Sequence, residues 1–223
     1  MMMKSSAAHY LGAGLSGLRA VQCGVPELAA APPRRVLDFG CGFGRVTRFL
    51  QAEWPEADVN VCDVDFTGLA FCLAHLGVRG FQVGVDPAAM RLGGDYDLIW
   101  VGSVVTHLDA PVIMKLLAVL AAALAPGGHV CFSSHGDLPV GRLKSGERYY
   151  GLAPPDAAAV VAGYETSGFG YANYFGQVGY GISASSQAWL VNAVAQTPGL
   201  AWCGFQASGW DNYQDIVVCR RDA

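Results

Sequence analysis

Short apolar runs alternate with longer stretches of helical periodicity along most of the chain. The apolar runs predict buried strands, and apolar residues that recur every three or four positions predict helices. The expected strands are residues 35–39, 58–62, 80–85, 95–101, 129–133, 200–206 and 213–220. The expected helices are residues 7–23, 44–53, 66–76, 110–124 and 186–196. Strands that alternate with helices in this way predict an α/β fold with a mostly parallel sheet.

Three glycines at alternate positions follow the first expected strand. Asp38 lies near the end of that strand, and Gly40, Gly42 and Gly44 come next, before a helical pattern begins. Glycine is needed where the backbone bends sharply and approaches a ligand closely, because it has no Cβ. The helix that follows offers free backbone N–H groups in its first turn. A strand, a glycine turn and a helix in this order indicate a cofactor site.

The spacing of this turn separates two classes of cofactor. A dinucleotide site requires G-x-G-x-x-G, whose third glycine would fall on Arg45. The carboxylate of Asp38 would repel a diphosphate but suits a ligand with a positive amino group. S-adenosylmethionine carries an ammonium, a carboxylate and a sulfonium, and no phosphate. The stretch therefore resembles the first motif of the class I S-adenosylmethionine-dependent methyltransferases. A strand-to-helix turn in another α/β protein remains the alternative.

The resemblance implies a Rossmann-like, doubly wound, seven-stranded sheet, mostly parallel with an antiparallel last strand. It also implies S-adenosylmethionine as cofactor and S-adenosylhomocysteine as product. Asp63 ends the second expected strand at the spacing of a carboxylate that binds ribose hydroxyls. In the family the following residue lies against the adenine, and a later acid accepts the adenine amino group. The expected cofactor-binding residues are Asp38, Gly40, Cys41, Gly42, Gly44, Asp63, Val64, Asp86, Gly102, Ser103 and Tyr10.

A second glycine motif near the N-terminus competes with this interpretation. Gly12, Gly14 and Gly17 fit G-x-G-x-x-G and resemble the opening of FAD-binding oxidoreductases. Against this, residues 5–9 make a poor parallel strand, and Pro32-Pro33 interrupts the βαβ unit that the motif requires. We therefore expect a helix whose small residues allow close packing, and in the family such a helix often covers the cofactor, which makes Tyr10 a candidate.

We expect a single methyltransferase domain over residues 1–223. Its parts are an N-terminal helical cap at 1–33, a cofactor-binding core at 34–135, an inserted substrate lid at 136–185, and a closing helix and strands at 186–223. The lid is inferred from length, because about fifty residues separate two elements that a short loop could join.

Composition narrows the class of protein. Apolar residues make up 52% and charged residues 14% of the 223 residues. This excess of apolar residues is consistent with a surface buried against a second copy, so a homo-oligomer is allowed. The net charge of −4 argues against a nucleic-acid partner, which favours a basic surface. No apolar run is long enough to predict a membrane span, and no signal peptide is recognisable. The seven cysteines contain no C-x-x-C pair, so we expect reduced thiols, a cytoplasmic protein and no metal site.

The expected lid is rich in tyrosine and glycine. Six of the nine tyrosines lie within residues 149–180, and no Lys or Arg occurs between Tyr149 and Cys219. Anionic acceptors favour cationic donors, so the segment favours a neutral small molecule or a carbohydrate hydroxyl as acceptor. An ordinary packed lid or a dimer interface is the alternative. The region also looks like methyltransferase modules found with bacterial glycosyltransferases, a possible partner. Arg142, Lys144 and Arg148 form the basic exception and could hold an acidic group.

Two histidines are candidates for a general base, which an alcohol acceptor needs as its proton becomes acidic. His135 follows the fifth expected strand at the carboxyl edge of the sheet, where ligands bind, and ranks above His107. Asp137, Glu165 and Asp211 are weaker candidates. Positioning without a base also suffices in many methyltransferases. A non-catalytic S-adenosylmethionine-binding module and an FAD-dependent oxidoreductase remain alternative functions.

Overall fold

The structure is a computed structural model that describes residues 7–222. Residues 1–6 of the expected N-terminal cap, and residue 223, lie outside the described part. The helices are α1 (Ala7–Gly24), α2 (Thr47–Glu53), α3 (Phe66–His75), α4 (Ala110–Ala123), α5 (Asp137–Ser145), α6 (Pro154–Ser167) and α7 (Gln187–Ala195), with 3-10 turns η1 (Pro26–Ala29), η2 (Pro87–Ala89) and η3 (Val105–His107). The strands are β1 (Arg35–Phe39), β2 (Asp58–Asp63), β3 (Arg79–Gln82), β4 (Tyr96–Val101), β5 (Leu124–Ser134), β6 (Phe169–Asn173), β7 (Gly181–Ser185), β8 (Leu200–Trp210) and β9 (Gln214–Arg221).

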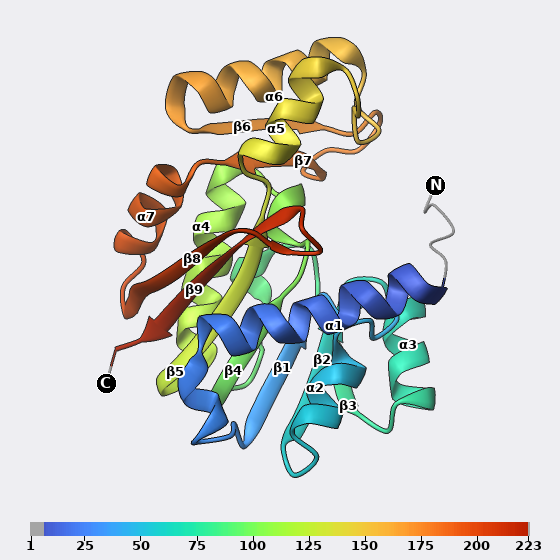
Figure 1. The fold of residues 1–223 in the computed structure, drawn as a ribbon, viewed down its shortest axis with the longest axis vertical. Coiled ribbons are helices and arrows are strands. Elements are labelled where there is room, and N and C mark those ends of the chain that lie inside the picture. Colours follow the sequence, from blue (N-terminus) through green and yellow to red (C-terminus); the bar gives the residue numbers. More distant parts are fainter. Residues whose placement is uncertain (1–6, 223) are drawn as a thin grey trace.

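The main sheet has seven strands in the order β3-β2-β1-β4-β5-β9-β8 (Figure 1). The first five strands run parallel, β9 is antiparallel to β5, and β8 is antiparallel to β9. The predicted Rossmann-like fold is therefore confirmed, with β9 as the one strand of this sheet that opposes the others. The strand order reverses between β1 and β4, which is where open α/β sheets bind ligands.

Both faces of the sheet are buried because successive side chains of a strand point to opposite faces. Val36, Leu98 and Val218 pack on one face with α1, α2 and α3. Leu37, Ile99 and Val217 pack on the other face with α4 and α7. This explains the near-continuous apolar runs of the central strands, which are typical of a sheet covered on both sides.

Several boundaries differ from the predictions for local reasons. The α2 helix begins at Thr47 rather than at residue 44, because Gly44 has a φ of +72°, which is outside the helical region. The β5 strand begins at Leu124 and includes Pro126, which was expected to separate helix from strand. The β3 strand ends at Gln82 rather than at residue 85, because β3 is the edge strand and its continuation leaves the sheet.

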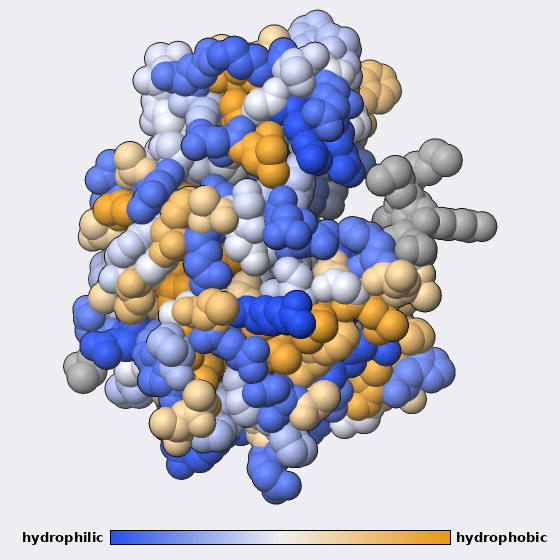
Figure 2. Space-filling model, viewed as in Figure 1, coloured by the Kyte–Doolittle hydropathy of each residue, from blue (hydrophilic) through white to orange (hydrophobic). Residues whose placement is uncertain are grey.

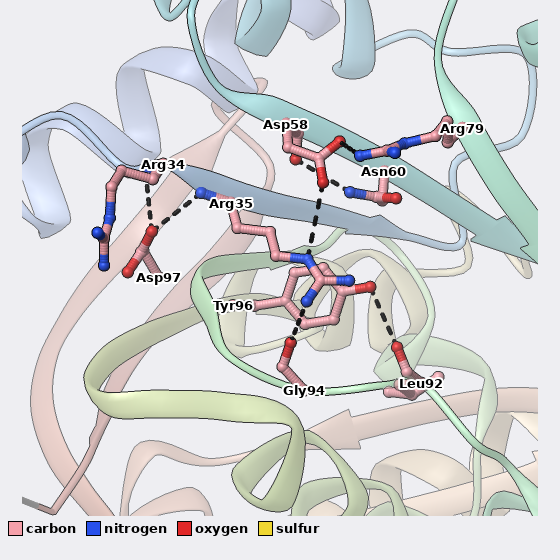
Figure 3. A network of polar contacts seen from close by, with 9 residues as sticks. All are labelled: Arg34, Arg35, Asp58, Asn60, Arg79, Leu92, Gly94, Tyr96 and Asp97. Carbon is pink, nitrogen blue, oxygen red and sulfur yellow. Dashed lines mark hydrogen bonds and ion pairs between the residues drawn. The ribbon is translucent and has the colours of Figure 1, made fainter.

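Polar side chains fix the amino edge of the sheet, opposite the edge where ligands are expected (Figure 3). Asp97 accepts hydrogen bonds from the backbone N–H groups of Arg34 and Arg35 at 2.8 and 2.9 Å. The guanidinium of Arg35 donates to the carbonyl of Gly94 at 2.7 Å and lies 4.7 Å from the ring centre of Tyr96. These contacts tie β1 to β4 and so help to set the alignment of their opposite ends.

The glycines of α1 serve helix packing. A Cβ on Gly14 would lie 2.1 Å from the carbonyl oxygen of Arg45, and one on Gly17 would lie 2.9 Å from a methyl of Val46. Gly12 faces no atom within 4 Å. The motif lies inside a continuous helix and not in a turn after a strand, so the FAD-type interpretation of Gly12-x-Gly14-x-x-Gly17 is wrong.

Residues 136–185 form a separate layer, here called the cap, beyond the carboxyl ends of the parallel strands (Figure 1). The cap consists of α5, α6 and the antiparallel pair β6–β7, and it has its own apolar cluster that includes Val160 and Ile182. Figure 2 shows a hollow between the cap and the core on the right-hand side of the view. The cap thus lies over the edge at which the expected cofactor residues end.

Candidate functional site

All three glycines of the turn after β1 have backbone conformations that favour glycine. Gly40, Gly42 and Gly44 have φ values of +76°, +50° and +72°, a region that other residues rarely adopt. A Cβ on Gly40 would lie 2.4 Å from Val104, and one on Gly44 would lie 2.3 Å from Leu76. Gly42 has no neighbouring atom within 4 Å of that position. The outer two glycines therefore allow close packing, and the middle one leaves room for a ligand.

Asp63 links the end of β2 to this turn. One oxygen of its carboxylate accepts the backbone N–H of Gly42 at 2.7 Å, and the other accepts the N–H of Asp65 at 2.8 Å. Each carboxylate oxygen keeps a second lone pair. The residue expected to bind ribose thus also holds the middle of the glycine turn in place.

Cys41 lies within the same turn, but its side chain is 6% exposed. The Sγ atoms of Cys41 and Cys72 both donate to the carbonyl oxygen of Gly42, at 3.5 and 3.3 Å. The thiol of Cys41 is therefore directed into the fold, and its backbone N–H donates to the carbonyl of Cys62 at 3.2 Å. All seven cysteines are free thiols.

Asp38 is a buried carboxylate beneath the turn. Its side chain is 2% exposed and accepts a hydrogen bond from the hydroxyl of Thr47 at 2.6 Å. Burial, together with the nearby charge of Asp63, raises the pKa of Asp38 to about 7. A buried carboxylate without a cationic partner is unstable in its charged form, and a positive ligand would stabilise it. This position therefore fits the ammonium group of S-adenosylmethionine.

The adenine end of the expected site has exposed apolar side chains. Val64 follows Asp63 and is 50% exposed, and Val85 is 83% exposed. Gln82 donates its side-chain N–H to the carbonyl of Val64 at 3.1 Å, which ties the two loops together. Asp86 is exposed and caps η2 by accepting the N–H of Ala88. Exposed valines and a nearby carboxylate fit an aromatic base that bears an amino group.

The residues after β4 are held by a polar network. Ser103 has a φ of +59°, and its backbone N–H donates to the hydroxyl of Ser133 at 2.7 Å. Gln214 accepts from Ser133 at 2.6 Å and donates to the hydroxyl of Ser103 at 3.1 Å. Gly102 is required because a Cβ there would lie 2.7 Å from the indole nitrogen of Trp100. Sequence reasoning did not identify Ser133 or Gln214, which come from β5 and β9.

Tyr10 places the first helix beside the glycine turn. Its hydroxyl donates to the carbonyl of Phe43 at 2.6 Å and accepts a hydrogen bond from the guanidinium of Arg48 at 3.0 Å. The guanidinium of Arg45 lies 5.7 Å from the ring centre. Tyr10 therefore contacts the turn directly, and its role in covering the cofactor stays a prediction.

His107 and His135 are both fixed by β7 of the cap. The Nδ1 atom of His107 lies 2.8 Å from the carbonyl oxygen of Gly181, and that of His135 lies 3.2 Å from the carbonyl oxygen of Ser183. A carbonyl can only accept, so Nδ1 carries the proton in both rings and Nε2 keeps its lone pair. Both imidazoles are thus held in the form that can accept a proton at Nε2.

The two histidines differ in their surroundings. His135 is 5% exposed, and burial lowers its pKa to about 3. His107 is half-buried, its ring lies 5.0 Å from that of Tyr180, and burial lowers its pKa below the usual value.

The three weaker candidates for the general base make other contacts. Asp137 accepts a hydrogen bond from Tyr164, Glu165 pairs with Lys144, and Asp211 lies beside α1.

Two surface cavities lie away from this edge. One of about 450 Å³ lies against α4 and η2, and one of about 380 Å³ lies against α1 and β8. Asp211, one of the weaker base candidates, lines the second cavity, and no expected cofactor-binding residue and neither candidate histidine lines either of them. Within residues 7–222, no group of three or more His, Cys, Asp or Glu side chains is arranged to hold a metal ion.

Fold and site together define a class I S-adenosylmethionine-dependent methyltransferase domain. Residues 36–128 match a family model described as "Methyltransferase domain"; the match runs from β1 to the first residues of β5 and includes the glycine turn. Residues 36–128 therefore belong to this class, whose cofactor is S-adenosylmethionine.

Curated relatives support the assignment. The chain is 31% identical over 156 residues to a trans-aconitate 2-methyltransferase from Methylobacterium nodulans, which covers 70% of this chain and 59% of the relative. It is 31% identical over 114 residues to a malonyl-[acyl-carrier protein] O-methyltransferase from Magnetococcus marinus, which covers 46% of this chain and 38% of the relative. The chain thus spans about half the length of the curated relatives it matches.

Solved structures share the fold. Magnesium protoporphyrin IX methyltransferase from Synechocystis superposes with a TM-score of 0.64 at 14% identity, over 100% of this chain and 90% of that one. The N-methyltransferase NodS from Bradyrhizobium japonicum superposes with a TM-score of 0.57 at 16% identity, over 93% of this chain and 86% of that one. Both structures contain S-adenosylhomocysteine.

Proposed function

We propose that this chain transfers a methyl group from S-adenosylmethionine to a hydroxyl of a small molecule bound between the sheet edge and the cap. The observation that carries the proposal is a pair of imidazoles, one in η3 after β4 and one directly after β5, each with a proton on Nδ1 and a lone pair on Nε2. Such groups suit an acceptor that must lose a proton.

In this proposal the cofactor is held by the residues of the glycine turn and the two adjoining strand ends. Asp38 faces its ammonium group, and Asp63 accepts hydrogen bonds from the ribose hydroxyls. Val64 and Asp86 contact the adenine. Gly102 and Ser103 lie beside the methionine part. The cofactor supplies a methyl group made electrophilic by a positive sulfur, and the protein aligns the acceptor oxygen with it.

We assign the role of general base to His107 rather than His135, the reverse of the order that the sequence suggested. A general base works best when its pKa is near the operating pH. A pKa of about 3 makes His135 too weak a base for that role, although its Nε2 can still accept a hydrogen bond from the acceptor. His107 is less buried and lies beside Tyr180 on the cap.

The identity of the acceptor is part of the proposal. A hydroxyl compound, such as a phenol, a hydroxy acid or a glycan, fits the phenol-rich wall that Tyr174 and Tyr180 form next to His107. The relatives are named for trans-aconitate and malonyl-[acyl-carrier protein], so their names do not point to one acceptor. A cytoplasmic location is supported by the seven free thiols. A glycosyltransferase partner or a homo-oligomer stays a prediction.

Methyl transfer from labelled S-adenosylmethionine to a panel of sugars, phenols and hydroxy acids tests this proposal. We expect the His107→Ala variant to lower kcat by about 100-fold or more while cofactor affinity stays near that of the wild type. His75→Ala, on the exposed end of α3, is the matched control and should keep full activity.

Two outcomes would contradict parts of the proposal. If His107→Ala and His135→Ala both keep near-wild-type turnover, no histidine acts as the base and positioning alone suffices. If no compound accepts the label although the protein binds the cofactor, the chain is a non-catalytic cofactor-binding module.

Within residues 7–222, the structure contains no helix that is both long and apolar enough to span a membrane.

A further inference from the structure

Buried polar atoms without partners gather around His135. Among the described residues, five buried side-chain polar atoms have no hydrogen-bond partner, and four of them are the hydroxyls of Ser134, Tyr150, Ser185 and Tyr213. Ser134 precedes His135 in β5, and the backbone N–H of Ser185 donates to the carbonyl of His135 at 2.8 Å. Native proteins pair most of their buried polar groups, so this concentration indicates a place built for a polar ligand.

The two tyrosines form the wall of this place. The ring centres of Tyr150 and Tyr213 lie 5.5 and 5.9 Å from that of His135, and 6.2 Å from each other. Tyr150 comes from the cap, and Tyr213 comes from the turn before β9. Burial raises the pKa of the Tyr150 phenol, so its hydroxyl stays protonated and can donate at neutral pH.

Two guanidinium groups lie over the same rings. Arg142 lies 5.0 Å from the ring centre of Tyr213, and Arg148 lies 5.0 Å from that of Tyr150 and 6.0 Å from that of Tyr213. Arg142 belongs to α5, and Arg148 follows that helix. Cation and phenol together present several hydrogen-bond donors on one side of His135.

One of the two guanidinium groups has no carboxylate partner among residues 7–222. The charged side chains that act on the Tyr150 hydroxyl are Arg148 and Arg142, opposed by Glu147. Glu147 pairs with Arg142 at 3.4 Å on the surface, and within residues 7–222 no carboxylate forms an ion pair with Arg148. Arg148 is therefore the guanidinium available to an anion, and the buried carboxylate of Asp215 lies across from Ser134 on β9.

The backbone at Tyr150 is strained in a way that supports a role for its side chain. Tyr150 has a φ of +54°, a conformation that costs free energy for a residue with a Cβ. The loop could avoid this cost with a glycine at this position, as it does at Gly151, which has a φ of +86°. The protein therefore has a phenol beside His135 at the cost of a strained backbone, where a glycine would remove both the strain and the phenol.

We propose that the cluster of Tyr150, Tyr213, Arg142 and Arg148 binds the carboxylate of the acceptor, so that the substrate is a hydroxy acid. This inference rests on the proposed methyl transfer and adds the chemical class of the acceptor. The two phenols and the two guanidiniums donate to the carboxylate, whereas the Nε2 lone pairs of His135 and His107 face groups that can donate, such as the hydroxyl to be methylated. The neutral acceptor expected from the sequence is thereby replaced with an acidic one.

Binding of matched acid and amide probes tests the assignment without turnover. The probes are 4-hydroxybenzoate and 4-hydroxybenzamide, and 3-hydroxybutyrate and 3-hydroxybutyramide, titrated by calorimetry or ligand-observed NMR into the protein saturated with S-adenosylhomocysteine. In at least one pair, we expect the acid to bind about tenfold more tightly than its amide, because a carboxylate makes charge-assisted hydrogen bonds.

The variants Arg148→Met and Arg142→Met should abolish that difference, and Tyr213→Phe should reduce it. Arg19→Met, on the exposed face of α1, is the matched control and should leave the difference unchanged. If both acids bind no more tightly than their amides, or if the arginine variants keep the preference, the carboxylate assignment is wrong. Because Arg148 is exposed, Arg148→Met remains informative should Tyr213→Phe fail to fold.

The test separates this inference from the proposed activity. Acids that bind through Arg148 but accept no label would contradict methyl transfer and leave the anion site standing. Label transfer to neutral hydroxyl compounds, with no preference for acids in binding, would support the activity and overturn the anion site.

Discussion

The carboxylate of Asp63 accepts a hydrogen bond from the backbone N–H of Gly42 at 2.7 Å, so the end of β2 holds the middle of the glycine turn after β1. One side chain therefore shapes the turn and is expected to bind the ribose. Loss of this side chain should affect both the cofactor and the loop beneath it.

Substitution Asp63→Ala should weaken S-adenosylmethionine binding by about tenfold or more, since charge-assisted hydrogen bonds are lost. Isothermal calorimetry measures this directly. Asp65→Ala is the control, because Asp65 only caps α3 by accepting the N–H of Thr67. It should lower stability by about 1 kcal/mol and leave cofactor affinity nearly unchanged. Equal affinity in wild type and Asp63→Ala would remove Asp63 from the site.

Cofactor binding should depend on the protonation of Asp38. The pKa of Asp38 in the folded protein is about 7, so the carboxyl is neutral in slightly acidic solution and charged above that pH. A cationic group prefers the charged form, so affinity should fall as the pH is lowered from 8 to 6. Calorimetry in buffers of different ionisation enthalpy should show release of up to one proton on binding at pH 6. Asp38→Asn should bind more weakly and without this proton release.

The same carboxyl predicts how stability changes with pH in the protein without cofactor. The pKa of Asp38 is raised from 3.8 to about 7 on folding. Between these values the folded state binds more protons than the unfolded state, so the free energy of unfolding should decrease as pH rises from 4 to 7. The stability contributed by this group is fully present below pH 4. Urea unfolding of Asp38→Asn should show a flatter pH dependence, and an identical slope in both proteins would refute the assignment.

The hydroxyl of Thr47 should lower the pKa of the Asp38 carboxyl. It donates to the Asp38 carboxylate at 2.6 Å and favours the charged form. Thr47→Val keeps the shape of the side chain but removes the donor, so the pH midpoint of cofactor binding should move upward. Stability at pH 7 should fall by about 1–3 kcal/mol because a buried carboxyl loses its partner. Thr47→Ser keeps the hydroxyl and should keep the wild-type midpoint.

The glycines of α1 provide a test of packing within one motif. Gly14→Ala should destabilise the protein by about 1–3 kcal/mol, because the added Cβ would lie 2.1 Å from the carbonyl oxygen of Arg45. Gly12→Ala meets no atom within 4 Å and should stabilise the helix by up to about 1 kcal/mol. Urea unfolding of both variants measures the contrast. Similar effects at both positions would contradict the packing role.

The sequence allowed prediction of the features that depend on local pattern. The strand β1 and the glycine turn after it follow from residues close together in the chain, and the structure confirms them. The motif of Gly12, Gly14 and Gly17 fits a dinucleotide site by its spacing alone. The residues before and after it do not form the βαβ unit that such a site requires, so a helix was predicted there. The end of β3 was less predictable, because an edge strand stops where its partner no longer pairs with it.

The parts of the site that arise from distant contacts could not be predicted. Nothing in the sequence near His135 shows that Tyr213 will pack against it, because the two residues meet only after β9 inserts beside β5. The network of Ser103, Ser133 and Gln214 has the same origin. The carbonyls of Gly181 and Ser183 that fix the two imidazoles carry no sequence signal, since every residue has a carbonyl.

The strand β7 also limits how this protein can be re-engineered or diversified. The carbonyls of Gly181 and Ser183 are two residues apart, so they point the same way along the strand, and each holds one imidazole. Deletion of Ile182, which lies between them, would point the two carbonyls to opposite sides, so that β7 could no longer hold both rings. A cap from another protein, grafted to change the acceptor, must therefore keep the backbone spacing of residues 181–185, whereas α5 and α6 can be exchanged without altering this spacing.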